Sequence, residues 1–157
     1  MKKLTYIAIL LLGFFPMLNA QGFEPNLTTA QTRSTQEGKT MMMVFSGSDW
    51  CKPCILLKRD ILSSPEFVAF ADENLVVLNL DFLFRKKNEL TPEQKAHNDA
   101  LAERYNPTGV FPLVLILNED QTVAQRIEYK MNMEPETFIQ HIDLPAPGQV
   151  STPKINQ

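Results

Sequence analysis

The chain has 157 residues, of which 44% are hydrophobic, 21% charged and 9% aromatic, and its formal net charge is −3. This composition is typical of one globular domain and argues against a disordered, collagen-like or multi-domain chain. The longest basic run is Arg85-Lys86-Lys87, too little positive charge to grip a phosphate backbone, so we expect no nucleic acid partner.

The N-terminus has the layout of a secretion signal. Two positively charged residues, Lys2 and Lys3, are followed by an apolar stretch over residues 4–18 and by a small residue, Ala20, at the expected cleavage site. A membrane anchor is the alternative, but the stretch is shorter than the roughly 20 residues that cross a bilayer, and Pro16 interrupts it. We therefore expect residues 1–20 to be a cleaved signal peptide. Because Gln21 stands where a lipoprotein has cysteine, we expect a soluble periplasmic protein, secreted if the host lacks an outer membrane.

Two helices are expected around the first strand. Residues 27–37, ahead of it, have moderate helical character despite many threonines and serines. Residues 52–62, after it, are expected to form the second helix, with Ile55, Leu56 and Ile61 as its apolar positions.

Short apolar runs predict the strands of a buried sheet. Three of them, over residues 41–46, 75–81 and 113–118, have the length and composition of buried strands. A fourth strand, over 122–128, follows a tight polar break. Residues 113–128 are therefore expected to form an antiparallel hairpin at the edge of the sheet.

Prolines mark the starts of three further helices. Ser64-Pro65 and Thr91-Pro92 each place a capping side chain before a proline at the first helical position. We expect the Gln94 side chain to complete a capping box by bonding back to the Thr91 amide. That helix is expected to run to about Arg104, and a last helix opens around Pro135.

Alternating strands and helices predict the fold class. The pattern indicates an α/β fold in which helices flank a central mixed β-sheet, forming one domain over residues 21–143. The segment 144–157 is rich in proline and has no periodic apolar face. We expect it to be a flexible C-terminal tail.

The two cysteines carry most of the functional information. They lie in Trp50-Cys51-Lys52-Pro53-Cys54, after the first predicted strand and at the start of the predicted helix. A thiolate at a helix N-terminus meets unpaired N–H groups and the positive end of the helix dipole, which lower its pKa below that of a free thiol. Cys51 is therefore the expected nucleophile. Cys54, one helical turn further on, is expected to attack the mixed disulfide and release the partner.

The two residues between the cysteines support this chemistry. Lys52 places a positive charge beside the reactive sulfur, which favours the thiolate. Pro53 donates no amide hydrogen and restricts the backbone between the two sulfurs.

Two other uses of the cysteines are open. A zinc site needs four ligands, and the other candidates, His97 and His141, stand singly on predicted surface helices where we expect them to be solvated. A purely structural disulfide would close a loop of two residues, for which the entropic stabilisation is near its minimum. We therefore expect no metal and no organic cofactor, only a redox-active Cys51–Cys54 pair.

The ordered motifs resemble the thioredoxin superfamily: a strand, the Trp-Cys-x-Pro-Cys motif, a helix, a strand, and a proline that opens the next strand. Residues 45–51, 64–67 and 105–112 are similar to a branch of exported bacterial thioredoxin-like proteins that includes periplasmic disulfide reductases of the Dsb type. The resemblance covers roughly residues 27–142 and is far more specific than a lone pair of cysteines.

This resemblance has implications for the loop before the third strand. It implies that the Phe111–Pro112 bond is cis and that Val110, Phe111 and Pro112 lie against the cysteines. In the family this loop pairs with the extended backbone of a client protein, and Trp50 flanks the same groove. The alternative for Trp50 and Phe111 is plain packing in the core.

The sequence also departs from the family pattern. Phe45 and Val77 stand where thioredoxin has a buried acid and a lysine, so a water or a peripheral group must deprotonate Cys54, or Cys54 reacts more slowly. The chain between Asp81 and Tyr105 is longer than in thioredoxin. We expect this insertion to cover the sheet edge; the alternative is that it shapes partner choice.

These features predict an exported thiol–disulfide oxidoreductase that reduces client proteins. A protein electron donor, for which a membrane protein is one option, would re-reduce it, and we expect a monomer. An oxidase or isomerase would use the same cysteines. A non-catalytic binding module with a static disulfide and a metal chaperone are alternatives from other classes.

Overall fold

A computed structural model of the chain describes residues 23–145. The predicted signal peptide and the predicted tail from residue 146 onward lie outside the described residues. Every helix between residues 23 and 145 is too short or too polar to cross a bilayer. The elements in chain order are α1 (Leu27–Glu37), β1 (Thr40–Ser46), α2 (Lys52–Leu56), the π-helix η1 (Leu57–Leu62), α3 (Pro65–Asn74), β2 (Leu75–Asp81), the 3-10 helix η2 (Lys86–Asn88), α4 (Pro92–Tyr105), β3 (Leu113–Leu117), β4 (Val123–Ile127) and α5 (Pro135–Gln140).

The four strands form one mixed sheet in the order β2-β1-β3-β4. Strand β1 is parallel to β2 and antiparallel to β3, and β3 is antiparallel to β4. The predicted hairpin over 113–128 is therefore confirmed, and β4 is an edge strand as expected. Because β1 and β2 are parallel, the loops that follow them leave the sheet at the same end.

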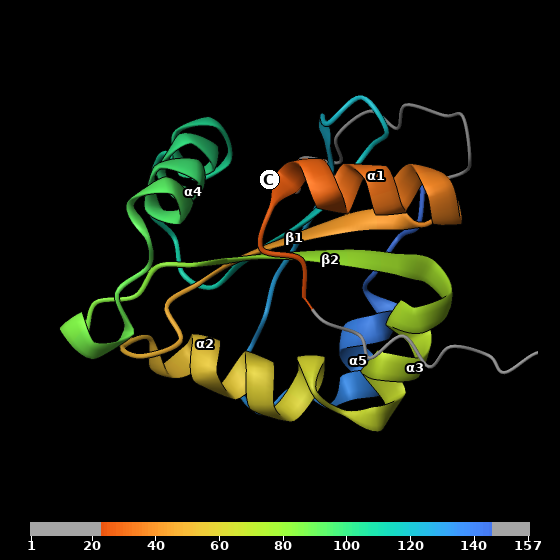
Figure 1. Ribbon diagram of the computed structural model, residues 1–157. Coiled ribbons are helices and arrows are strands. Elements are labelled where there is room, and N and C mark those ends of the chain that lie inside the picture. Colours follow the sequence, from red (N-terminus) through yellow and green to blue (C-terminus); the bar gives the residue numbers. More distant parts are fainter. Residues whose placement is uncertain (1–22, 146–157) are drawn as a thin grey trace, which may run out of the picture.

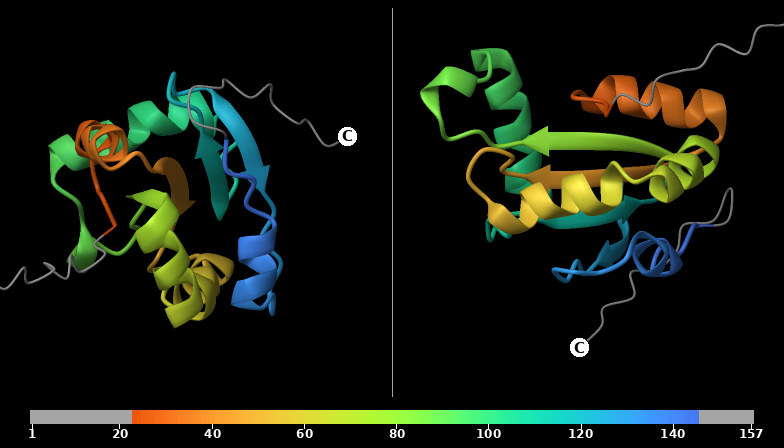
Figure 2. Two further views of the ribbon diagram at one scale, coloured as in Figure 1. Left: turned by 90° about the vertical axis from the view of Figure 1, so that its right-hand side faces the viewer. Right: turned by 90° about the horizontal axis from the view of Figure 1, so that it is seen from below.

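Helices cover both faces of the sheet (Figure 1), and the further views in Figure 2 show the same two layers. Helices α1 and α4 lie on one face, and α2, η1, α3 and α5 lie on the other. Side chains alternate along β1, so Met42 and Val44 join the apolar cluster under α3 and α5, whereas Met43 and Phe45 join the cluster under α1 and α4. The predicted α/β fold with a flanked mixed sheet is confirmed.

The predicted helix over 52–62 differs from the observed one in its second half. Its last six residues form the π-helix η1, which buries Leu57, Ile61 and Leu62, whereas Ile55 is 41% exposed. The wider hydrogen-bonding pattern of a π-helix changes which positions share a face, so a single α-helical period does not describe residues 52–62. Two of the three predicted apolar positions, Ile55 and Leu56, lie in α2 ahead of η1 and are not buried.

Contacts between α1 and α4 correct two further predictions. Thr91 caps α4 as expected, but the Gln94 side chain does not return to it. The Gln94 amide instead donates to the Pro25 carbonyl at 2.8 Å and to Asn98 Oδ1 at 2.9 Å. The Pro25 carbonyl is available because the segment ahead of α1 packs against α4, whereas Asn98 lies one turn further along α4 itself. A local capping rule cannot take account of a partner as distant in sequence as Pro25.

His97 is half-buried rather than solvated. Its Nε2 atom accepts a hydrogen bond of 3.1 Å from the Leu27 amide, in the first turn of α1. Since Nε2 accepts, the ring proton belongs on Nδ1, which lies 3.1 Å from Asn98 Oδ1. His97 therefore joins two helices, while His141 is exposed after α5, as expected.

Candidate active site

The two cysteines form a disulfide at the N-terminus of α2, with Cα atoms 5.3 Å apart. Cys51 is the N-cap residue of this helix, and its sulfur accepts a hydrogen bond of 3.3 Å from the Cys54 amide. Both residues are nearly buried, with 5% of Cys51 and 2% of Cys54 exposed. The amide that reaches the Cys51 sulfur is one of the free donors of the first helical turn, the kind of group that stabilises a thiolate.

The residues between the cysteines lie in the first turn of α2. The Lys52 side chain is exposed, and among residues 23–145 no carboxylate pairs with it. Pro53 is half-buried at the position where a missing amide hydrogen costs least. The positive charge of Lys52 is therefore not neutralised by a carboxylate of the described residues.

The loop between β1 and α2 is fixed to the end of β2. The Ser48 amide donates to Asp81 Oδ1 at 2.8 Å, and the Ser48 hydroxyl donates to Asp81 Oδ2. Within the loop, the Cys51 amide donates to the Gly47 carbonyl at 2.8 Å. The Ser48–Asp81 hydrogen bonds attach the loop to β2, and the Cys51–Gly47 hydrogen bond fixes Cys51 within the loop.

Trp50 stands beside the disulfide and is 49% exposed, so it is not a core residue. Its Nε1 atom donates to the Phe82 carbonyl at 2.6 Å. The indole lies directly over Gly47, where an added Cβ would come within 2.4 Å of the ring. A glycine is needed here because of this close approach.

Replacing Gly47 with alanine is therefore expected to push the Trp50 indole off the loop and break its bond to Phe82. The chain contains one tryptophan, so fluorescence reports this change directly. We expect the emission to shift to longer wavelength as the ring enters water. Gly38→Ala is the control: it strains a left-handed residue with a φ of 64° and no neighbour within 4 Å, and it should leave the emission unchanged. Identical spectra for Gly47→Ala and the unmodified protein would contradict the prediction.

The loop before β3 lies next to Trp50. Its Phe111–Pro112 peptide bond is cis, as the resemblance implies. The Phe111 ring meets the Trp50 ring edge to face, with centroids 5.4 Å apart. Phe111 and Pro112 are half-buried and Val110 is 36% exposed. The structure thus places the 110–112 loop against Trp50, the residue that precedes Cys51.

Asn106 positions this loop and was missed from the sequence. It accepts from the Val110 amide at 2.8 Å and donates to the Val110 carbonyl at 2.9 Å, so it binds the backbone as a neighbouring strand would. It is buried and follows α4 directly. An asparagine after a helix usually signals only the end of that helix.

Asp49 is a second polar residue that was missed. Its carboxylate accepts from the Phe84 and Arg85 amides, each at 2.9 Å, and from Asn88 Nδ2 at 3.1 Å. These bonds, the one from the Phe84 amide above all, lower the pKa of Asp49. They fix the start of the insertion beside the redox loop, while α4 covers the sheet (Figure 1). The insertion therefore adjoins the candidate active site as well as the sheet.

The positions that carry buried charge in thioredoxin are apolar and buried here. Phe45 lies in the cluster under α1 and α4, and Val77 lies under α3. Neither can accept the proton of Cys54. Between residues 23 and 145 there is also no group of three or more His, Cys, Asp or Glu side chains that could hold a metal ion.

Known proteins resemble this chain in sequence and in structure. The chain is 37% identical over 106 residues to the disulfide bond reductase DsbH of Chlamydia pneumoniae, which is 68% of this chain and 60% of that protein. It is 25% identical over 136 residues to the thioredoxin-related protein DsbJ of the same organism, which is 81% of this chain and 38% of that protein. The chain thus spans less than two thirds of either relative.

A solved structure described as DsbH oxidoreductase aligns with a TM-score of 0.66 at 27% identity, covering 83% of this chain and 88% of that one. The sequence profile of a family described as thioredoxin-like matches residues 23–119, which include the cysteines, the insertion and the 110–112 loop. By this match and by its fold, the chain belongs to the thioredoxin-like family.

Proposed function

We propose that the protein is an exported thiol–disulfide oxidoreductase that reduces disulfides in client proteins. The observation that carries this proposal is the Cys51–Cys54 disulfide at the start of α2, with Trp50 and the 110–112 loop around it. The relative named as a disulfide bond reductase supports reduction as the direction. No metal or organic cofactor takes part in the proposed reaction.

The reaction starts from the reduced protein. The Cys51 thiolate attacks one sulfur of the client disulfide, a bond forms between Cys51 and that sulfur, and the other client sulfur leaves as a thiolate. Cys54 then loses its proton and attacks the Cys51 sulfur. The intramolecular disulfide forms, and the second client sulfur leaves as a thiol. Two electrons pass from the protein to the client, and the two protons that the client sulfurs take up balance those that the Cys51 and Cys54 thiols have lost.

The two cysteines differ in what activates them. The Cys54 amide, 3.3 Å from the Cys51 sulfur, and the positive end of the helix stabilise the Cys51 thiolate, and exposed Lys52 adds a positive charge nearby. Within residues 23–145 no hydrogen-bond donor reaches the Cys54 sulfur, and the apolar side chains of Phe45 and Val77 cannot take its proton. In our proposal its proton passes to water or to the thiolate that the client has just released.

The 110–112 loop supplies a place for the client backbone. Asn106 occupies the amide and carbonyl of Val110, whereas within residues 23–145 nothing bonds the amide and carbonyl of Phe111. An extended client segment can pair with Phe111 as an added strand. Trp50, Val110 and Pro112 then border the client cysteine.

The remaining parts of the proposal concern the cell. We propose that residues 1–20 are removed on export, that the domain over residues 21–143 acts as a monomer in the periplasm, and that a second redox protein returns electrons to the Cys51–Cys54 pair.

The reduction potential of the Cys51–Cys54 pair tests the direction. We expect a value near or below about −240 mV, close to that of thioredoxin, because the helix N-terminus and Lys52 stabilise the reduced thiolate to a limited extent. The measurement is thiol alkylation followed by a gel shift in glutathione and dithiothreitol redox buffers, with Cys54→Ser as the control that cannot form the internal disulfide. A value of about −120 to −180 mV, the range of oxidases and isomerases, would overturn the direction.

A further inference from the structure

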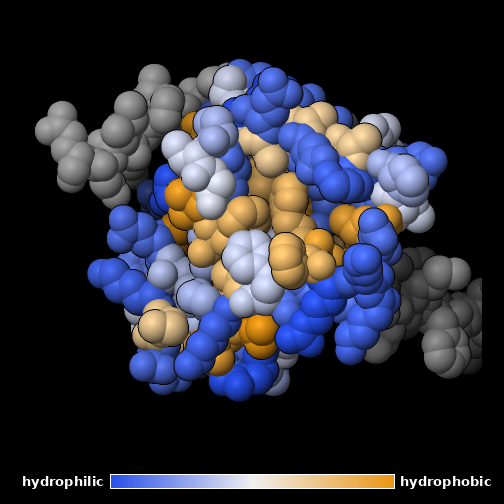
Figure 3. All heavy atoms as spheres, turned by 90° about the vertical axis from the view of Figure 1, so that its left-hand side faces the viewer, coloured by the Kyte–Doolittle hydropathy of each residue, from blue (hydrophilic) through white to orange (hydrophobic). Residues whose placement is uncertain are grey.

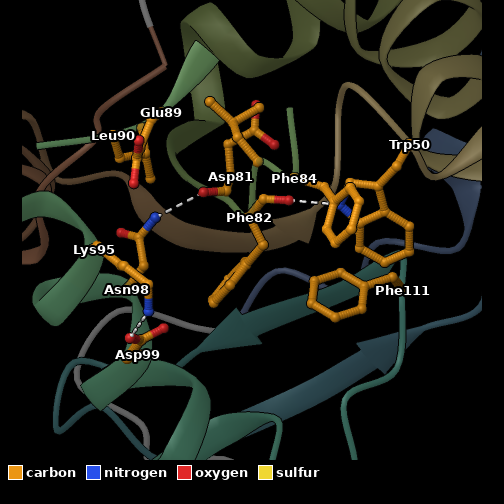
Figure 4. Close-up of a pocket in the computed structure, with 11 residues that line it drawn as sticks. Trp50, Asp81, Phe82, Phe84, Glu89, Leu90, Lys95, Asn98, Asp99 and Phe111 are labelled. Atoms are coloured by element: carbon orange, nitrogen blue, oxygen red, sulfur yellow. Dashed lines mark hydrogen bonds and ion pairs between the residues drawn. The ribbon is translucent and has the colours of Figure 1, made fainter. Parts of the chain in front are cut away.

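A pocket of about 350 Å³ opens beside Trp50, the residue that precedes Cys51 (Figure 4). Trp50, Phe111 and Phe84 lie at one end, Leu90 lies at the other, and Phe82 lies between them. The volume is at the lower end of the range of about 300–1,000 Å³ found for ligand sites, which suits one or two amino-acid side chains. Trp50, next to Cys51 in the chain, and Phe111, whose ring meets that of Trp50, both line this pocket.

The insertion builds most of this pocket. Apart from Trp50, Asp81 and Phe111, every lining residue lies between positions 82 and 99. Hydrogen bonds hold the walls in place before any ligand arrives: Trp50 Nε1 donates to the Phe82 carbonyl at 2.6 Å, and Asn98 Nδ2 donates to the Asp81 carbonyl at 2.9 Å. A pocket that is already formed loses little conformational entropy on binding.

The surface around the pocket has the character of a binding face. Phe84 is 84% exposed and Trp50 is 49% exposed, so two large aromatic rings meet water beside a hollow. Figure 3 shows that apolar side chains gather at the centre of this face and that hydrophilic side chains surround them. An apolar centre with a polar rim is typical of surfaces that bind another polypeptide.

The pocket lining carries more acidic than basic side chains. Three acidic residues and one lysine line the pocket. Lys95 pairs with Asp99 at 2.5 Å, and Asp81 accepts hydrogen bonds from Ser48. In the described part of the chain, no side chain pairs with the carboxylate of Glu89, which is exposed. A positively charged partner group therefore has a free carboxylate to meet here.

We propose that this pocket takes a bulky apolar side chain of the client segment that carries the disulfide, and that Glu89 favours a lysine or arginine next to that side chain. The inference rests on the proposed function, because the client is held for reduction by Cys51. A client backbone paired with Phe111 runs past Trp50, so side chains near the client cysteine reach the pocket.

Chromogenic peptides test this proposal. Each peptide carries one cysteine in a mixed disulfide with thionitrobenzoate, and phenylalanine or alanine stands at one of two positions on either side of it. The pre-reduced protein gives up two electrons and becomes the disulfide, while the peptide thiol and coloured thionitrobenzoate are released. At one position or more, we expect the second-order rate constant to be about tenfold higher for the phenylalanine peptide.

Variants of the pocket connect this preference to the structure. Phe84→Ala and Leu90→Ala are each expected to reduce the phenylalanine-to-alanine ratio by about threefold or more. Met131→Ala is the matched control, since Met131 is 56% exposed and lies outside the pocket, and it should keep the ratio. We expect the unmodified protein to react faster with peptides that carry lysine beside the apolar residue than with peptides that carry glutamate there. Glu89→Lys is expected to reverse this preference.

The possible failures are distinguishable. If the reduced protein reacts with no peptide, the proposed function fails. If it reacts equally with phenylalanine and alanine peptides at every position, or if the pocket variants keep the full preference, the pocket proposal is overturned and the function stands. If the unmodified protein sediments as a dimer and Phe84→Ala as a monomer, the pocket holds a second copy of the chain, which also overturns the proposal.

Discussion

Replacing Cys51 with serine is expected to abolish disulfide reduction, with a loss of about a thousandfold or more in the rate. The hydroxyl of serine is not ionised at neutral pH, so the first attack on the client disulfide cannot occur. The Cys54 amide and the helix N-terminus still point at residue 51, but they have no thiolate to stabilise. Turnover of an insulin-like disulfide substrate by the reduced protein measures the effect.

Cys54→Ser is the matched variant, because it removes one sulfur from the same motif but leaves the first step intact. We expect it to accumulate a mixed disulfide between Cys51 and the client, visible as a reducible band on a gel. If the Cys51→Ser variant, and not Cys54→Ser, accumulated the mixed disulfide, Cys54 would be the attacking cysteine and Cys51 the resolving one. A partner that stays bound to the Cys51→Ser variant without any covalent link, together with an unmodified protein that reduces nothing, would favour the non-catalytic binding module.

Replacing Phe138 with alanine is expected to lower the free energy of unfolding by about 3–5 kcal/mol. The Phe138 side chain is fully buried, and its ring packs against Phe67 with centroids 6.1 Å apart. It is the one buried residue within α5, a helix of six residues, so its removal leaves a cavity and takes away the main contact of that helix. A loss of this size is a large part of the stability of a typical domain, about 5–15 kcal/mol.

Urea denaturation followed by circular dichroism measures this change. Phe84→Ala is the control, since it makes the same substitution at a side chain that is 84% exposed, and we expect a change within about 0.5 kcal/mol. Equal denaturation midpoints for the two variants would show that the α5 contact does not stabilise the domain.

The fold was largely predictable because its elements depend on local patterns. Each strand begins and ends within one residue of its predicted bounds, since short apolar runs between polar breaks are unlike anything else in the chain. The capping residues Ser64 and Thr91 were found for a similar reason, because each bonds to an amide three residues away. The π-helix η1 was not found, since the 3.6-residue period of an α-helix describes its sequence almost as well.

The polar framework of the candidate site was less predictable. Asp49 bonds to residues 35 to 39 positions away, and His97 bonds to an amide 70 positions away. Such partners are brought together only by the packing of the sheet and helices. Asn106 acts over four residues, yet its role depends on the turn that the chain makes after α4. The cysteines, in contrast, were identified by spacing and by their place after a strand.

Adjacent residues in the redox loop have different anchors: Ser48 is fixed to the end of β2, whereas Asp49 and Trp50 are fixed to the insertion. Most surface loops tolerate shortening, because little else depends on them. Deleting residues 83–90 would instead leave the Asp49 carboxylate without its amide donors, so the loop that carries Cys51 would lose part of its support. The cysteine motif therefore depends on the insertion for its support, and a designer who grafts this motif onto another thioredoxin-like scaffold must transfer both.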